Sequence, residues 1–370
     1  MRPFLSLADY GRIIARRYEK CAHPLDGLAA GEPAGASSGN NLSERDQESV
    51  AECISQSVEV EKGRLDAHGR LDEERAPHGR GAWADDLLCR VLDPCPSRKF
   101  SVLVTHDLDR TTLWEATALA KRLIRRKARE PETAAWPLFG CRRVIEKKVD
   151  ELLRFEADQN IRSIFFFLSG SYGLGRYGSR TSLSWRSAKS ILCAVQAAGM
   201  EIGLHGSYYA KDKCTYVDEC RRLEDAAHRL IRHHRNHYLR YDTLRVWGQL
   251  SEAGISFDHS VGFVGGWGFR TGTCIPYPAY DLSAGAVSTI VEVPMLLMDG
   301  PWAEKEDPNA LTAVRAALEV VQRHRGCVSI NFHPEALATN SIVWESFKRI
   351  VGICRELGAE MAQWEGPDVA

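Results

Sequence analysis

The chain has 370 residues, of which 44% are hydrophobic, and this is enough for one large α/β domain with a smaller appendage. Its 48 lysines and arginines nearly balance its 49 aspartates and glutamates, which argues against a broad nucleic-acid surface or one for acidic membranes. No apolar run approaches the roughly 18 to 20 residues of a membrane-spanning helix. Taken as the natural start, the charged first residues lack the pattern of a signal peptide and predict a cytoplasmic protein.

The eleven cysteines follow no repeated spacing and include no Cys-x-x-Cys pair. Their odd number and scattered positions favour neither a disulfide framework nor a cysteine zinc site. We interpret most of them as buried thiols in a reducing compartment.

Residues 1–98 differ in composition from the rest of the chain. Residues 5–21 and 83–92 could form short helices, but the segment between them is rich first in Gly, Ala and Ser and then in charge. Such a composition is typical of a weakly ordered region. We predict an N-terminal appendage and linker over residues 1–98, disordered in part.

Residues 99–363 alternate short apolar runs with longer amphipathic segments. About seven strands are predicted, at residues 100–104, 163–168, 201–204, 237–240, 255–258, 290–293 and 328–332. Between them lie helical stripes such as Ile145, Val149 and Leu152. The alternation predicts a parallel sheet covered by helices, as a closed or nearly closed barrel or as an open doubly wound sheet. In both folds reactive residues gather where strands end.

Two carboxylates follow the first predicted strand. Alternation along residues 105–109 places Asp107 and Asp109 on one side and His106 on the other. Neighbouring carboxylates repel each other, and a divalent cation would relieve the repulsion. The alternative is a helix cap with a solvated turn, but paired acids after a buried strand favour a functional site.

Histidines and an arginine end other predicted strands. His205 ends the run at 201–205, and its imidazole suits a transition-metal ion, although a lone histidine is usually structural. Arg235 is suited to pair with a carboxylate, and His237 follows it closely, although a basic helix end is an alternative for both. His333 ends the last strand before Pro334, and we interpret it as a general acid, with a structural core histidine as the alternative.

Five motifs, taken together and in their order along the chain, resemble those of the polysaccharide deacetylases, the NodB-homology superfamily or carbohydrate esterase family four. They are Thr-His-Asp-Leu-Asp at 105–109, Ile-Phe-Phe-Phe at 164–167, Glu-Ile-Gly-Leu-His at 201–205, Arg235 with Tyr238, and Asn-Phe-His at 331–333. The resemblance covers roughly residues 99–363. It implies a distorted seven-stranded (β/α) barrel, one divalent metal ion and removal of N- or O-acetyl groups from sugars.

The resemblance also implies roles for single residues. Asp107 is similar to the family's catalytic base and Asp109 to its metal-binding aspartate. His205 is similar to the first metal-binding histidine, Arg235 to the arginine that orients the base, and His333 to the general acid.

One position departs from the family pattern. The family usually carries a second histidine four residues after the first, where this chain has Tyr209. His237 is our candidate for the third ligand, and His106 is a weaker one. A site completed by water, or one without metal, is a further alternative. The departure indicates a divergent branch, with the segment 268–273 as its own signature.

The sequence thus predicts a metal-dependent carbohydrate deacetylase of polysaccharide or envelope glycan biosynthesis. Zinc is the preferred metal, with cobalt, nickel or iron as alternatives. Arg270, Tyr208 and Trp267 are the candidate substrate-binding residues, since backbone amides and Arg270 could hold the substrate and aromatic rings can stack on sugars. Two alternatives stay open: a non-catalytic glycan- or partner-binding member, and another barrel hydrolase that acts on amide or glycosidic bonds. The oligomeric state stays undetermined.

Overall fold

The structure, a computed structural model, describes residues 99–111, 144–170, 182–210, 212–240, 245–304 and 308–361. The predicted appendage and its two short helices lie outside these residues. The strands are β1 (Ser101–Leu108), β2 (Ile164–Leu168), β3 (Glu201–Gly206), β4 (His233–Asn236), β5 (Phe257–Asp258), β6 (Tyr277–Asp281), β7 (Ala286–Glu292), β8 (Met295–Met298) and β9 (Cys327–Asn331). The helices are α6 (Val144–Asp158), α7 (Arg186–Ala197), α8 (Lys213–Ala227), α9 (Val246–Glu252), α10 (Pro308–Arg323), α11 (Pro334–Thr339) and α12 (Ser341–Glu356), with a 3-10 turn η3 (His237–Leu239).

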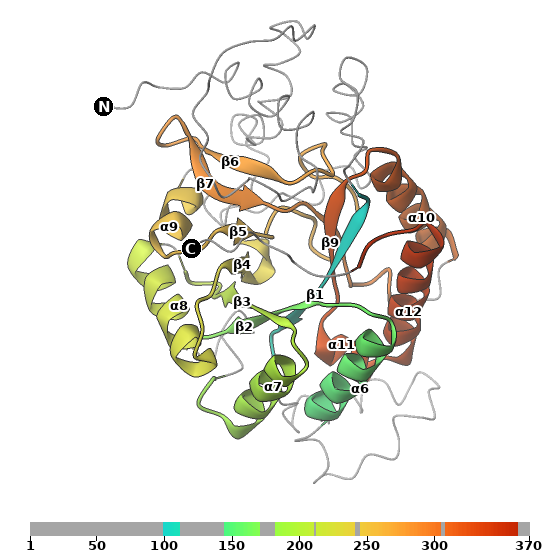
Figure 1. Ribbon diagram of the computed structural model, residues 1–370, viewed down its shortest axis with the longest axis horizontal. Helices are drawn as coiled ribbons and strands as arrows, with labels where there is room; N and C mark the ends of the chain where they lie inside the picture. The colour runs from blue at the N-terminus through green and yellow to red at the C-terminus, as the bar shows by residue number, and fades with distance from the viewer. Residues whose placement is uncertain are drawn as a thin grey trace, which may run out of the picture.

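The strands form one nine-stranded sheet in the order β6-β7-β5-β4-β3-β2-β1-β9-β8. Only the β6–β7 pair is antiparallel, and each of the other pairs is parallel. The sheet curls, and the helices lie around its outer side (Figure 1). The predicted α/β barrel with helices outside is therefore confirmed. The strand count differs because β6 and β8 add to the predicted set, in which residues 290–293 correspond to the end of β7.

One predicted strand was placed wrongly along the chain. Residues 237–240 were expected to be a strand, but the strand is β4 and residues 237–239 form η3. The preceding histidines had indicated a basic helix end, yet both are buried. The His234 Nδ1 atom lies 2.6 Å from Asp258 Oδ1, and the His233 ring stacks on Phe257. Burial, with nearby Arg229, lowers the pKa of His233 to about 3, so this side chain is neutral and tolerates a buried strand.

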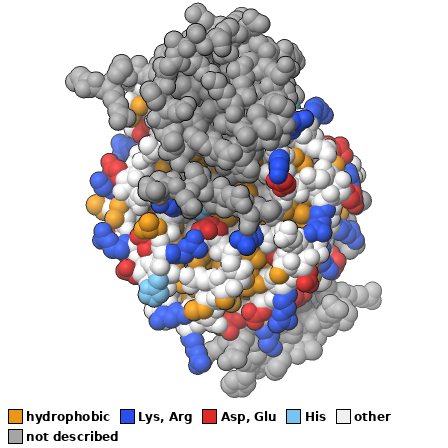
Figure 2. All heavy atoms as spheres, viewed as in Figure 1, with side chains coloured by type: hydrophobic (Ala, Val, Ile, Leu, Met, Phe, Trp, Pro, Cys, Tyr) orange, Lys and Arg blue, Asp and Glu red, His pale blue; other side chains and the backbone are white. Residues whose placement is uncertain are grey.

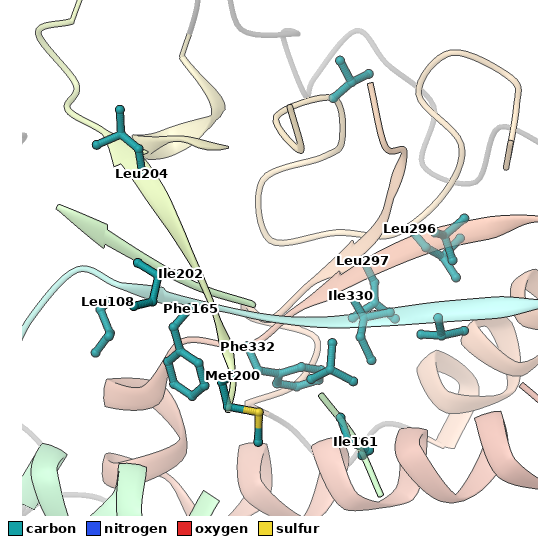
Figure 3. Close-up of a cluster of buried hydrophobic side chains, with 14 of the residues drawn as sticks. Leu108, Ile161, Phe165, Met200, Ile202, Leu204, Leu296, Leu297, Ile330 and Phe332 are labelled. Carbon is teal, nitrogen blue, oxygen red and sulfur yellow. The ribbon is translucent and has the colours of Figure 1, made fainter. Parts of the chain in front are cut away.

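Both faces of the sheet are largely buried, and they differ in the polarity of their side chains. On the outer face a large apolar core fills the space beneath the helices; Leu108, Phe165, Ile202, Leu204, Ile330 and Phe332 belong to it (Figure 3). On the inner face a small apolar cluster of Leu103, Phe257, Val291, Val293 and Cys327 closes one end. Towards the carboxyl ends of the strands, the inner face becomes polar and holds His205, Arg235 and Asp107.

The surface carries charges of both signs. Figure 2 shows acidic and basic side chains interspersed over the described part of one face. Among the described residues, no helix combines the length and the apolar composition that crossing a membrane would require.

Gly203 makes room on the inner face of β3. A Cβ atom at this position would lie 2.5 Å from ring atoms of Phe166 and 3.1 Å from the Cβ of His233. The ring of Phe166 in turn lies beneath the guanidinium of Arg235, 4.6 Å from its Cζ. The absence of a side chain at Gly203 therefore allows the Phe166 ring to support the polar layer.

We expect Gly203→Ala to lower the free energy of unfolding by about 1–3 kcal/mol, because overpacking must displace the Phe166 ring. Gly352→Ala is the matched control, since a Cβ atom there meets nothing within 4 Å on α12. That control should gain about 0.5–1 kcal/mol from helix propensity. Urea unfolding of both variants measures the difference, and a Gly203→Ala protein as stable as the wild type would contradict the packing argument.

Candidate active site

The candidate site lies where parallel strands end. Asp107 is the second-to-last residue of β1, and Asp109 follows that strand directly. His205 is near the end of β3, His237 comes directly after β4, and His333 follows β9. Residues far apart in the chain meet here because the carboxyl ends of neighbouring parallel strands share one edge of the sheet.

Three side chains bring one ligand atom each to a common point. His205 Nε2 is 3.1 Å from Asp109 Oδ1 and 3.1 Å from His237 Nδ1, while His237 Nδ1 is 3.0 Å from Asp109 Oδ1. Among the described residues this is the cluster whose geometry could hold a metal ion. The sequence named these three residues as ligands, and the structure brings them together.

A backbone carbonyl fixes the orientation of His205. Its Nδ1 lies 2.9 Å from the carbonyl oxygen of Arg235, an atom that can only accept a hydrogen bond. Nδ1 therefore carries the hydrogen, and a neutral His205 presents the lone pair of Nε2 to the cluster. A buried lone pair that faces a carboxylate and a second imidazole calls for a cation or a proton between them.

A strained turn places His237. The residues that follow it, Tyr238 and Leu239, have φ values of 57° and 49°. These values lie in the left-handed region, which non-glycine residues adopt at a cost of about 1–3 kcal/mol each. The chain therefore bends sharply within η3, directly after His237, and the imidazole Nδ1 lies 3.0 Å from Asp109 Oδ1.

The two histidines of this cluster stabilise the ionised form of Asp109. Burial acts to raise the pKa of Asp109, but His237 and the hydrogen bonds with His205 and His237 outweigh it. The net effect holds the pKa of Asp109 well below its usual range, so the carboxylate is ionised at neutral pH.

Asp107 lies beside the cluster with both of its oxygens bonded. Oδ1 accepts a hydrogen bond from Arg235 Nη1 at 2.9 Å, and Oδ2 accepts one from Asn331 Nδ2 at 3.0 Å. Burial acts to raise the pKa of Asp107, but Arg235, followed by His205 and His333, lowers it on balance. Oδ2 also faces His205 Nε2 at 4.0 Å and His333 Nε2 at 3.9 Å, so it points into the site.

His333 is held by a carboxylate that sequence reasoning missed. Its Nδ1 lies 2.5 Å from Asp299 Oδ1, and its backbone N–H donates to Asp299 Oδ2 at 3.2 Å. Burial acts to lower the pKa of His333, but the charge and hydrogen bond of Asp299, together with Asp109, raise it well above the usual value. In the sequence, Asp299 could have been recognised as an acid that directly follows the apolar run 293–298, which contains β8.

Glu335 is a second residue that the sequence analysis did not name. Its pKa is raised to about 8 by burial and by the charge of Asp109, while His333 acts in the opposite direction. One of its carboxyl oxygens, Oε2, is buried without a hydrogen-bond partner in the described part of the chain. Its sequence signal was only its position, two residues after His333.

The remaining candidates lie outside the cluster. His106 points to the outer face, where its ring nitrogens contact the Phe332 carbonyl and Glu156, both at 2.8 Å. Arg270 and Tyr208 are buried, each with about 3% of its surface exposed. Trp267 is half-buried, and its ring meets that of Trp302 edge to face at 5.8 Å.

The comparisons with known proteins give matches only among solved structures. No family model and no curated protein sequence matches the chain. A Mycobacterium smegmatis protein named as a polysaccharide deacetylase gives a TM-score of 0.41 at 17% identity, over 74% of this chain and 96% of that one. The chitin deacetylase of Colletotrichum lindemuthianum gives 0.35 at 11% identity, over 71% and 84%. A family-four pseudoenzyme from Bacillus anthracis gives 0.33 at 14% identity, over 71% and 63%.

These names fall in the superfamily that the sequence motifs resemble. The scores and identities are too low to carry an argument about function, which therefore rests on the geometry of the site.

We expect Asp299→Asn to lower the pKa of the His333 imidazole by more than about one unit, towards the ordinary value of about 6.5. The raised pKa of His333 contributes stability that is present below about pH 6.5 and lost as the pH rises through the raised value. The stability lost in the variant should therefore be largest near about pH 6 and shrink at alkaline pH.

Histidine NMR titration and urea unfolding of chelator-treated protein measure both effects. Glu345→Gln, at an exposed position that pairs with Lys348 on α12, is the control. An unchanged His333 titration in Asp299→Asn would contradict the assignment.

Proposed function

We propose that this chain is a metal-dependent hydrolase of the polysaccharide deacetylase superfamily, which removes an acetyl group from an amino sugar or an O-acetylated glycan. The observation that carries the proposal is the convergence of Asp109, His205 and His237 at 3.0–3.1 Å beside two further pairs. These pairs are Asp107 with Arg235 and His333 with Asp299.

The three-residue cluster fits a divalent metal ion. Two imidazole nitrogens and one carboxylate oxygen are a common ligand set for catalytic zinc, which keeps a further position open. Atoms spaced by about 3 Å suit ligands that each lie about 2.0–2.2 Å from one ion. The hydrogen bond from His205 Nδ1 to the carbonyl oxygen of Arg235 is the kind of contact that metal-binding histidines usually make with their second ring nitrogen. Zinc is our first choice, and cobalt, nickel and iron accept the same ligands.

Two of the surrounding groups are suited to move protons. A bound divalent cation would supply Lewis-acid chemistry, polarising the acetyl carbonyl and lowering the pKa of water. The carboxylate of Asp107 stays ionised beside Arg235 and can accept the proton of the attacking water through Oδ2. His333 is protonated beside Asp299 and can donate a proton to the departing nitrogen or oxygen. The opposite directions of their pKa shifts support Asp107 as the base and His333 as the acid.

Aromatic side chains support a carbohydrate substrate. Trp302 donates from Nε1 to the carbonyl of Met298 at 2.8 Å, next to Asp299, and the ring of Trp267 packs on it. Both rings are half-buried, so they retain exposed surface for contact with a sugar. We place the substrate among the glycans or glycan precursors of polysaccharide or envelope biosynthesis.

One feature favours a second candidate function, a glycan-binding protein without activity. Tyr209 replaces the family's second histidine and is 42% exposed, against the ring of the buried Tyr208. An exposed tyrosine that follows β3 by three residues suits sugar stacking as well as it suits a divergent enzyme. Metal binding and acetate release distinguish the two functions.

We expect chelated protein to take up one zinc ion per chain, and Asp109→Ala, His205→Ala and His237→Ala each to weaken its affinity more than about 100-fold. Each change removes one of the three ligand atoms. Isothermal titration with zinc measures the affinity, and His228→Asn, at an exposed left-handed helix end, is the control. A wild-type protein that binds no zinc, or a His237→Ala variant with full affinity, would contradict the metal site.

We expect Asp107→Asn to lose about 10²- to 10⁴-fold in kcat for acetate release from an N-acetylglucosamine oligosaccharide, because the amide cannot accept the water's proton. Zinc content should be retained, since Asp107 is not among the three ligands. Asp225→Asn, on the exposed side of α8, is the matched control. If Asp107→Asn keeps most of the activity, Asp107 is not the base.

A further inference from the structure

The carboxyl group of Glu335 has one oxygen that the protein leaves without a partner. Oε2 is buried and accepts no hydrogen bond from the described residues. Buried carboxyl oxygens in folded proteins are almost always bonded, because an unpaired one costs the full desolvation penalty. Such an atom beside a candidate active site indicates a hydrogen-bond partner that arrives with a ligand.

The surroundings of Glu335 place this oxygen beside the proposed acid. Its carboxyl lies close enough to Asp109, His333 and Asp299 for their charges to act on it. Its backbone is firmly held, since Pro334 opens α11 and Thr339 Oγ1 donates to the Glu335 carbonyl at 2.7 Å. Helix α11 packs against α6 and α12, so the carboxyl is presented from a fixed support.

Direct coordination of the metal does not explain Glu335. Among the described residues, the ligand atoms that come within reach of one ion belong to Asp109, His205 and His237 alone. Glu335 is therefore left to interact with whatever lies next to His333. In the proposed reaction that neighbour is the atom that departs from the acetyl group.

We propose that Glu335 accepts a hydrogen bond from the N–H of the substrate's acetamido group and thereby selects N-acetyl amides over O-acetyl esters. This inference rests on the proposed deacetylase function. Above its pKa of about 8 the carboxyl of Glu335 is ionised and can only accept hydrogen bonds. An amide nitrogen then carries the hydrogen that the unpaired oxygen needs, whereas an ester oxygen carries none and faces the carboxylate with lone pairs. A site built to bond a substrate N–H rejects the analogue that lacks it much more strongly than an apolar pocket rejects a missing methylene.

The proposed step balances as a simple hydrolysis. The acetyl carbon gains a bond to the water oxygen, and its bond to nitrogen breaks. One water proton passes to Asp107, and His333 gives its proton to the nitrogen. The immediate products are acetic acid, which keeps the second water proton, and a primary amine, whose N–H groups can still donate to Glu335. The proton taken up by Asp107 replaces the one that His333 gave up.

The test compares two substrates that differ in one atom: an N-acetylglucosamine trimer and a glucose trimer acetylated on the oxygen of the same carbon. In zinc-loaded protein assayed at about pH 9, where Glu335 is ionised, Glu335→Leu should lower kcat/KM for the amide about 10- to 100-fold, the range expected for a lost bond to a charged acceptor. The ester should change less than about 3-fold. Glu335→Gln keeps an acceptor oxygen and should fall between the wild type and Glu335→Leu on the amide.

Glu345→Leu, an exposed glutamate on α12, is the matched control, and zinc content with thermal melting verifies each variant. Equal losses on both substrates, no loss on either, or a wild type that cleaves only the ester would overturn the selection by Glu335 and leave the deacetylase in place. A wild type that cleaves neither substrate would overturn the proposed function and the inference together.

Discussion

The buried guanidinium of Arg235 is the constraint on which the rest of the site depends. It is fully enclosed on the inner face of the sheet, where an unpaired charge would be very costly. Its donors reach Asp107 Oδ1 and Thr105 Oγ1 on β1, Ser329 Oγ on β9 and the carbonyl of His259 after β5. One side chain on β4 thus links the neighbouring strands β1 and β9 with the segment after β5, and it fixes the carboxylate of Asp107.

Two ion pairs lie beside the ligand cluster, Asp107 with Arg235 and His333 with Asp299, and they shift the pKa values of Asp107 and His333 in opposite directions. Arg235 lowers the pKa of Asp107 and keeps it an acceptor, whereas Asp299 raises the pKa of His333 and keeps it a donor. The two side chains approach to 3.9 Å at Asp107 Oδ2 and His333 Nε2. The site therefore holds a proton acceptor and a proton donor close together without their neutralising each other, because each has its own counter-charge.

Much of this arrangement was predictable from the sequence. Alternation after an apolar strand placed Asp107 and Asp109 on the inner face and His106 on the outer, and parallel strands implied that His205 and His333 would join them. Other features were not predictable. Asp299 follows a strand that was not recognised, and the buried pair of His234 with Asp258 resembled a charged helix end.

Local sequence patterns were enough to predict the class of fold and most of the chemical groups of the site, because hydrophobic periodicity and strand ends are local properties. Which of these groups act together depends on how the chain folds in three dimensions. His237 joins the cluster because the chain turns through a left-handed conformation after it, and Glu335 keeps an unpaired oxygen because no described donor reaches it. Distances between residues about 100 to 200 positions apart depend on packing, and packing is not written in any local pattern.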